Sequence, residues 1–253
     1  MALKQLNYWG YSKLDKFVSR FFKKNDLKRN NFIFKLPKSK FWYSRQYEYA
    51  WAAQFANWAD IVLDAACGII HPLKFYLSDI CKEVFACDFN DKITSINDML
   101  KEIKNAFGEE SLKNIPKNYK TINYCKASLT SLPYKNKQFD KIFCISVLEH
   151  LNNVIFVKYP FILKFLNFLF YRDNIYLALK EFKRILKDDG LIILTFDYPD
   201  INIKYLYKIL SEIELEFASK IILEIPENAI YSEDLKIYCF RAVLRKTKIK
   251  QFD

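Results

Sequence analysis

The chain has 253 residues, 51% of them hydrophobic, so it can bury the core of one large α/β domain and is no disordered tail. Its six cysteines form no C-x-x-C pair and it has only two histidines, which argues against a metal site and indicates a reducing compartment, the cytoplasm. The N-terminus lacks the pattern of a signal peptide, and no long stretch is uncharged, so we expect neither secretion nor a membrane span.

The net charge of +11 is concentrated near the N-terminus. Residues 1–58 hold 12 Lys or Arg against 3 Asp or Glu, which leaves only +2 for the remainder. Such a segment suits an anionic substrate, nucleic acid, an acidic lipid surface or a partner, and the simpler alternative is a solvated face of N-terminal helices. We predict a basic, aromatic helical extension over 1–58, followed by the main domain over 59–253.

From residue 61 onward, apolar segments alternate with helical ones, as expected of βαβ units around a parallel sheet. The segments that we predict as its strands are Ile61–Ala65, Glu83–Cys87, Lys120–Cys125, Lys141–Ser146 and Leu191–Phe196. Amphipathic helices are predicted over Lys92–Phe107 and Ile175–Leu186, and Gly190 would end the second one.

The C-terminal part continues with one helix and two strands. The helix is predicted over Ile203–Phe217. Lys220–Ile225 and Ile237–Arg245 are predicted to be strands and could form an antiparallel pair at the edge of the sheet.

The first predicted strand runs into an acid and then a turn of small residues, Asp64-Ala65-Ala66-Cys67-Gly68. This segment resembles the first motif of the class I S-adenosylmethionine-dependent methyltransferases, a strand followed by D-x-G-x-G-x-G. Gly68 matches the middle glycine, whereas Ala66 and Ile70 replace the first and third. An alanine with positive φ costs about 1 kcal/mol relative to glycine, so the shape of the loop is in question.

The second strand ends in Asp88-Phe89, which places an acid 24 residues after Asp64. In a parallel nucleotide-binding fold an acid at this position can accept both ribose hydroxyls. The resemblance implies that Asp88 binds the adenosyl ribose and that Phe89 flanks the adenine. The alternative is that Asp88 is a helix N-cap.

Two later segments extend the resemblance. Residues 127–134, A-S-L-T-S-L-P-Y, are similar to the family's adenine-contacting turn, with Ser128 and Leu129 at the contacts and Ser128 where an Asp is common. The fourth strand then reaches Ser146 and ends in V-L-E-H, as the family's fourth strand does. Residues 181–195 are similar to the family's helix, its L-K-p-G-G turn and its fifth strand. These segments together cover roughly residues 60–198.

The resemblance implies a Rossmann-like three-layer α/β/α fold, with a mostly parallel seven-stranded sheet and an antiparallel edge strand. It also implies S-adenosylmethionine as the cofactor, bound by Asp64, Ala66, Cys67, Gly68, Asp88, Phe89, Ser128, Leu129 and Ser146. Methyl transfer from a sulfonium is an in-line displacement, so the protein mainly holds the two reactants in line and excludes water.

Candidate catalytic and acceptor-binding residues lie after the fourth and fifth strands, after the glycine loop and in the basic N-terminal segment. His150 lies at the mouth of the fourth strand and is the candidate general base, with a structural hydrogen bond as the alternative role. The candidate acceptor contacts are Tyr43, Arg45, His71, Asp197 and Tyr198. His71 could equally shape its turn or touch the cofactor, and Asp197 could cap a turn.

Residues 152–174 form an apolar insertion interrupted by lysines and a proline. We predict a substrate-covering lid or a dimer surface, and the alternative is a helix lying on a membrane surface. The protein would be a monomer or a homodimer.

A small-molecule acceptor, anionic, phosphorylated or nucleotide-linked as in surface-glycan precursors, is the predicted substrate of an O-methylation. A nucleic-acid methyltransferase is disfavoured because the fourth strand lacks an N-P-P-Y-like tetrapeptide. A dehydrogenase would need three glycines where only Gly68 is present, and no phosphate-binding P-loop exists. The incomplete glycine loop keeps a non-catalytic binding protein as a further alternative.

Overall fold

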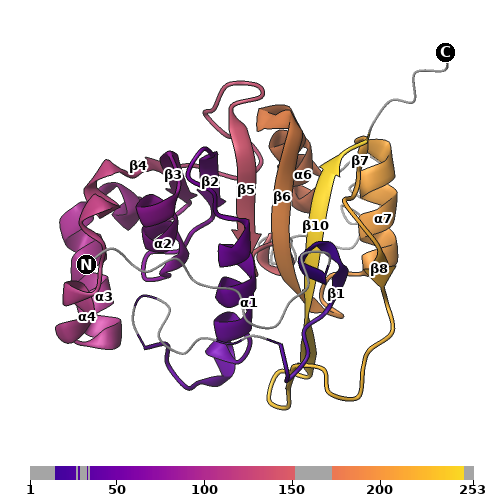
Figure 1. The fold of residues 1–253 in the computed structure, drawn as a ribbon, viewed down its shortest axis with the longest axis horizontal. Helices are drawn as coiled ribbons and strands as arrows, with labels where there is room; N and C mark the ends of the chain where they lie inside the picture. The colour runs from indigo at the N-terminus through magenta and orange to yellow at the C-terminus, as the bar shows by residue number, and fades with distance from the viewer. Residues whose placement is uncertain (1–14, 27, 29–32, 34, 152–172, 248–253) are drawn as a thin grey trace, which may run out of the picture.

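The computed structural model describes residues 15–26, 28, 33, 35–151 and 173–247. Its strands form one sheet in the order β4-β3-β2-β5-β6-β10-β1-β8, with β7 and β9 paired to β10 beside this path (Figure 1). The strands are β1 (Ser19–Phe21), β2 (Ile61–Ala65), β3 (Glu83–Asp88), β4 (Asn123–Lys126), β5 (Phe139–Ile145), β6 (Leu186–Tyr198), β7 (Leu215–Phe217), β8 (Ile221–Ile222), β9 (Tyr231–Ser232) and β10 (Ile237–Lys246).

Helices flank this sheet. The α-helices are α1 (Arg45–Ala52), α2 (Leu73–Ile80), α3 (Ile96–Phe107), α4 (Glu110–Lys113), α6 (Asn174–Ile185) and α7 (Ile203–Glu212). The short 3-10 helices are η1 (Asp15–Phe17), η2 (Lys40–Trp42), η3 (Ala53–Phe55), η4 (Asp91–Thr94), η5 (Lys117–Thr121) and η6 (Leu148–His150). Within the described ranges, none of the helices combines the length and apolarity of a membrane span.

Two separate apolar clusters show that the fold has three layers. Side chains that alternate along the strands point to opposite faces of the sheet. On β5, Phe143 packs with α1, α2 and α3, whereas its neighbours Ile142 and Cys144 pack with α6 and α7. On β6, Ile193 belongs to the first cluster and Ile192 and Leu194 to the second. The predicted Rossmann-like three-layer fold is confirmed.

The central strands agree closely with the prediction. β2 has the predicted bounds, β3 extends one residue further, and β5 begins two residues earlier. These strands are buried on both faces, which makes them continuous apolar runs in the sequence.

The prediction was less accurate at two segment ends. Residues 120–122 do not belong to β4, because η5 continues to Thr121. Gly190 does not end a helix either: α6 ends at Ile185, and β6 begins at once at Leu186 and includes the glycine. A Cβ on Gly190 would lie 2.6 Å from Leu186 Cδ1, so the glycine is required by close packing beside an irregularity in the β5–β6 pairing.

The antiparallel strand is not at the edge of the sheet. β10 is antiparallel to β6, and β1, β7 and β9 all pair with its outer side. The predicted pairing of residues 220–225 with residues 237–245 is wrong, because β8 pairs with β1 and β1 lies between β8 and β10. The predicted helix over 203–217 ends at Glu212, and Leu215–Phe217 forms β7. The described sheet therefore has ten strands where seven were predicted.

The described part of residues 1–58 is integrated into the domain and is not helical throughout. β1 joins the sheet, with Phe21 packed on the α6–α7 face and Phe22 on the α1–α2 face. Next to it, the buried Arg20 pairs with Asp15 and Asp26. The predicted insertion over 152–174 lies, apart from its last two residues, outside the described residues.

If β1 is part of the domain core, Phe21→Ala should lower the free energy of unfolding by about 4 kcal/mol. The Phe21 ring is 1% exposed and packs edge-to-face on Phe240 at 5.0 Å and on Tyr198 at 5.4 Å. Urea unfolding followed by circular dichroism measures the change. Phe41→Ala, in the same segment but 64% exposed, is the control and should change stability by less than about 0.5 kcal/mol. Equal effects of the two substitutions would contradict the assignment of β1 to the core.

Candidate active site

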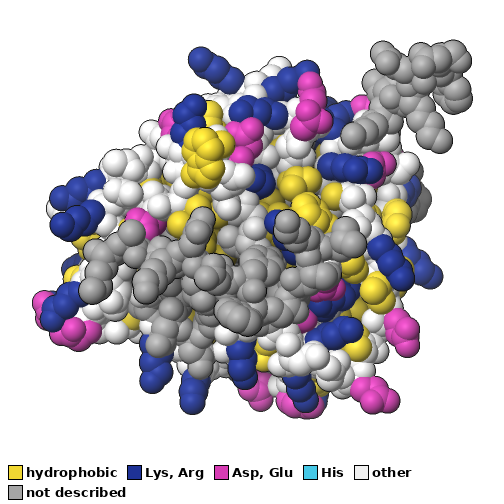
Figure 2. All heavy atoms as spheres, viewed as in Figure 1, with side chains coloured by type: hydrophobic (Ala, Val, Ile, Leu, Met, Phe, Trp, Pro, Cys, Tyr) yellow, Lys and Arg dark blue, Asp and Glu magenta, His cyan; other side chains and the backbone are white. Residues whose placement is uncertain are grey.

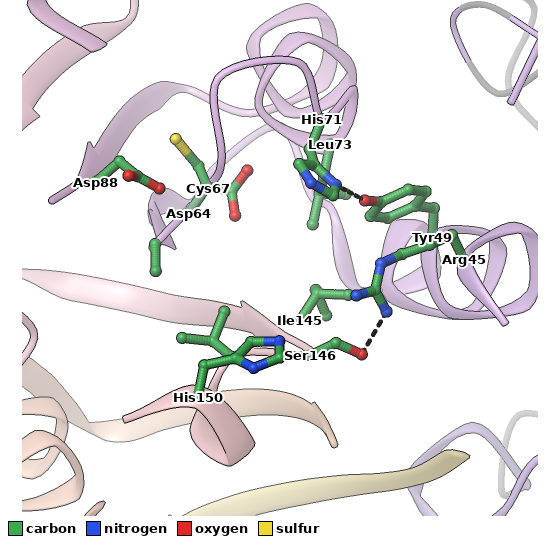
Figure 3. Close-up of a pocket in the computed structure, with 12 residues that line it drawn as sticks. Arg45, Tyr49, Asp64, Cys67, His71, Leu73, Asp88, Ile145, Ser146 and His150 are labelled. Carbon is green, nitrogen blue, oxygen red and sulfur yellow. Dashed lines mark hydrogen bonds between the residues drawn. The ribbon is translucent and has the colours of Figure 1, made fainter. Parts of the chain in front are cut away.

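A cavity of about 280 Å³ opens at the carboxyl ends of β2, β3 and β5, where open α/β sheets bind their ligands (Figure 3). Its walls come from these strand ends, the loop after β2, the loop after β5 and two helices. The lining residues are Arg45, Tyr49, Asp64, Ala66, Cys67, His71, Leu73, Asp88, Ile145, Ser146, Val147 and His150.

The loop after β2 has the left-handed backbone that the motif requires. Ala66 has φ of +52° and Gly68 has φ of +61°, so the alanine takes a conformation that normally favours glycine, at a cost of about 1 kcal/mol. The loop is held at several points: the Gly68 N–H donates to Asp88 Oδ2 at 2.9 Å, and the fully buried Lys74 donates to the carbonyls of Gly68 and His71 at 2.6 and 2.7 Å.

Gly68 also leaves room for a neighbouring side chain. A Cβ at this position would lie 2.2 Å from His71 Cδ2. The His71 ring stacks on Trp42 with centroids 4.9 Å apart, and its Nδ1 is hydrogen-bonded to the Tyr49 hydroxyl. Burial, with the nearby charges of Arg45 and Lys74, holds the pKa of His71 well below its ordinary value, so this imidazole is neutral.

Asp64 is a buried acid that faces the cavity (Figure 3). Its Oδ2 has no hydrogen-bond partner among the described residues. Burial raises the pKa of Asp64 to about 7, although the nearby Lys74 ammonium opposes the shift. A cationic donor in the cavity would satisfy this oxygen and favour the carboxylate form.

Asp88 ties the end of β3 to the glycine loop. Its Oδ2 accepts from Gly68 N–H and its Oδ1 from Asn90 N–H, both at 2.9 Å. The N-cap of the following helix η4 is Asn90, so the N-cap role considered for Asp88 is filled by another residue. Each carboxylate oxygen has further acceptor capacity toward the cavity.

A buried ionic network connects α1 to the ends of β5 and β6. Glu48 is bonded to Arg45 Nη1 at 2.6 Å, to the Ser44 hydroxyl at 2.6 Å, to the Ser146 hydroxyl at 2.7 Å, and to the Thr195 hydroxyl. Burial alone would raise the pKa of Glu48, but Arg45 and the three hydroxyl donors hold it below its ordinary value. The carboxylate is therefore charged, and it fixes Arg45 and Ser146 at the cavity wall.

His150 lies on the opposite side of the cavity from His71 (Figure 3). Partial burial and the charge of Arg45 lower the pKa of His150, which leaves a neutral imidazole at pH 7. Its side chain makes no hydrogen bond to a described residue, whereas its backbone N–H donates to Val147 O within η6.

The other predicted residues lie outside the lining of this cavity. Tyr43 donates to Asp197 Oδ1 at 2.9 Å, and Tyr198 packs against Phe21. Phe89 is 76% exposed at the end of β3. Ser128 is hydrogen-bonded to Thr130, and the Leu129 side chain packs in the α6–α7 core.

The comparisons with known proteins bear directly on this site. A family model described as a methyltransferase domain matches residues 63–158, a range that holds the glycine loop, Asp88 and His150. Residues 63–158 therefore belong to a methyltransferase domain. No curated protein matches this methyltransferase.

Solved structures share the fold at low sequence identity. The [4+2]-cyclase SpnF aligns with a TM-score of 0.55 at 11% identity over 80% of this chain and 82% of its own. A TehB-like SAM-dependent methyltransferase from Corynebacterium glutamicum aligns at 0.46 and 15% identity, over 79% and 87% of the two chains. A SAM-dependent methyltransferase from Aquifex aeolicus aligns at 0.46 and 14%, over 76% and 85%.

Sequence reasoning missed three buried polar residues of this methyltransferase. Glu48 and Tyr49 belong to α1, and Lys74 belongs to α2. A lysine among apolar residues in L-K-F-Y-L, directly after a glycine loop, is a signal that could have been noticed. Glu48 gave no comparable signal, since its partners Ser146 and Thr195 are 98 and 147 residues away. Among the described residues there is no cluster of three or more metal-ligating side chains.

Replacing Glu48 by Gln should destabilise the methyltransferase by about 3 kcal/mol, because it leaves the buried Arg45 without its counter-charge. Thermal or urea unfolding measures the change. Glu110→Gln is the matched control: this residue also pairs with a basic residue three positions away, but both side chains are more than 70% exposed. We expect the control to change stability by less than about 0.5 kcal/mol. A Glu48→Gln variant as stable as the control would show that the network carries no stability.

Proposed function

We propose that this methyltransferase binds S-adenosylmethionine in the cavity after β2 and methylates a hydroxyl group of a small anionic acceptor. The observation that carries the proposal is the pair of acids at the ends of adjacent strands, Asp64 and Asp88, on either side of a left-handed glycine loop. This arrangement lies within the range that the methyltransferase-domain model matches.

The residues fit the cofactor. The unpartnered Asp64 Oδ2 would receive the ammonium group of its methionine part, and the loop 66–68 would lie along that part. Asp88 would accept the ribose hydroxyls, with the exposed Phe89 beside the adenine. When bound, the cofactor supplies an activated methyl group whose leaving thioether needs no protonation.

The chain's own contribution to the reaction is positioning and proton removal. A hydroxyl acceptor must lose its proton as it is methylated, and a neutral imidazole accepts a proton in this pH range. We assign this role to His150, which faces the cavity and carries no competing hydrogen bond to a described residue. Arg45, held by Glu48, presents a fixed positive charge to an anionic acceptor.

We place this reaction in the cytoplasm, and the state of the thiols supports this part of the proposal. All six cysteines are unpaired, and four of them are buried. Unpaired thiols in this number are typical of a reducing compartment.

Calorimetric titration of S-adenosylhomocysteine tests the cofactor site. Asp88→Asn should weaken binding at least tenfold, about 1.4 kcal/mol, because it removes the charged acceptor for the ribose. The substitution retains an oxygen for the Gly68 N–H, so the loop should stay in place. Asp91→Asn removes a nearby acid that is 83% exposed, and we expect little change. Absence of binding to the intact protein would favour the non-catalytic alternative.

The raised pKa of Asp64 predicts a pH-dependent affinity. An acid whose pKa rises to about 7 on folding keeps its proton in the free protein below that pH, and the stability gained from this protonation is lost as the pH rises toward 7. A cationic ligand prefers the carboxylate, so affinity for S-adenosylmethionine should rise about tenfold from pH 5.5 to pH 7. Titrations at several pH values measure it. In Asp64→Asn the rise should disappear, and a rise that persists would assign it to another group.

A further inference from the structure

A second cavity, of about 530 Å³, lies in the segment that precedes and begins α1, and the proposed reaction does not use it. It is basic and aromatic in character. Its lining residues are Lys28, Leu36, Pro37, Lys38, Ser39, Lys40, Trp42, Tyr43 and Gln46. In the view of Figure 1 the described part of this segment runs along the lower part of the molecule, and Figure 2 shows Lys and Arg side chains at the lower left edge, with Asp and Glu side chains further right.

The positive charge at this cavity is not neutralised by its own segment. Residues 27–47 contain six Lys or Arg and no Asp or Glu. The three acids of residues 1–58 are all bonded to arginines: Asp15 and Asp26 to Arg20, with Asp15 also bonded to Arg241, and Glu48 to Arg45.

The lysines of the cavity have no acidic partner among the described residues. Lys28, Lys38 and Lys40 form no ion pair with any described residue, and outside the described residues the sequence holds a single acid, Asp253. Three lysines thus contribute to the wall of one cavity, and their positive charges would attract a multivalent anion.

This second cavity borders the active-site cavity. Trp42 lines the second cavity, and its ring stacks on His71, which lines the first. Tyr43 also lines the second cavity and is hydrogen-bonded to Asp197 at the end of β6. A ligand held by the lysines would thus lie one stacked pair of rings away from the site of methyl transfer.

We infer that the second cavity binds the phosphate groups of the acceptor, and that the acceptor is a small molecule carrying a diphosphate. The inference rests on the proposed function for the identity of the ligand as an acceptor. The binding itself is a separate property of the lysines and can be measured without methyl transfer.

Calorimetric titration of uridine diphosphate into the full-length protein tests this inference. Inorganic pyrophosphate is the second probe, and uridine is the uncharged control. We expect both phosphate compounds to bind and uridine not to bind, with an affinity that falls as salt is added. The Lys38→Ala/Lys40→Ala variant should bind uridine diphosphate about tenfold more weakly.

Two matched variants separate charge at the cavity from charge in general. Lys101→Ala/Lys117→Ala removes two exposed lysines that line neither cavity and should leave the affinity within about twofold of the intact protein. Lys38→Arg/Lys40→Arg retains the charge and should retain most of the binding. Asp88→Asn should weaken the binding of S-adenosylhomocysteine at least tenfold and leave the binding of uridine diphosphate unchanged, which would show that the two sites are independent.

Several results would overturn the inference. They are absence of diphosphate binding to the intact protein, equal binding of uridine, and an unchanged affinity in Lys38→Ala/Lys40→Ala. If a single-stranded RNA oligonucleotide binds more tightly and displaces uridine diphosphate, the ligand of this cavity is a nucleic acid and not a small molecule. If the intact protein binds uridine diphosphate but not S-adenosylhomocysteine, the proposed function is contradicted and the phosphate site is retained.

Discussion

The structure depends on one buried carboxylate, that of Glu48. A charge removed from water must be paired and hydrogen-bonded, and Glu48 obtains its partners from its own helix and from the ends of two central strands. The requirement fixes α1 against the sheet edge at which the cavity opens. It also fixes the positions of Arg45 and Ser146, because both bond to the same carboxylate. For this reason α1 forms a wall of the cavity.

The central part of the fold was predictable because its signals are local. β2, β3 and β5 carry apolar residues on both faces, and small or polar residues mark the carboxyl edge of the sheet: β2 ends in Ala65, β3 ends in Asp88, and Ser146 directly follows β5. The loop at 66–68 and the acid at Asp88 have a fixed relation to these strand ends. Their meeting in one cavity therefore followed from the order of the strands.

The outer strands and the polar network were not predictable in the same way. β1 has three residues, and it is a strand because β8 and β10, more than 200 residues later, pair with its two sides. Lys187–Gly190 has the sequence of a helix stop, but pairing with β5 places it in a strand. Glu48 appeared to be one more charged residue on a helix. In each case the deciding contact is made with a distant part of the chain. Local propensity contains no information about such contacts.

The anchoring of the glycine loop has a consequence for the evolution of such a site. Four glycines are present in the whole chain, and only one remains in this loop. The loop keeps its shape because Cys67 N–H bonds to Cys87 O, Asp88 holds Gly68 N–H, and Lys74 holds two carbonyls. With these supports an alanine in a left-handed conformation costs little of the total stability. Such a loop can therefore have other residues in place of glycine and keep the same backbone conformation. The backbone conformation of the loop can then be retained where the glycine pattern of the motif is no longer recognisable in the sequence.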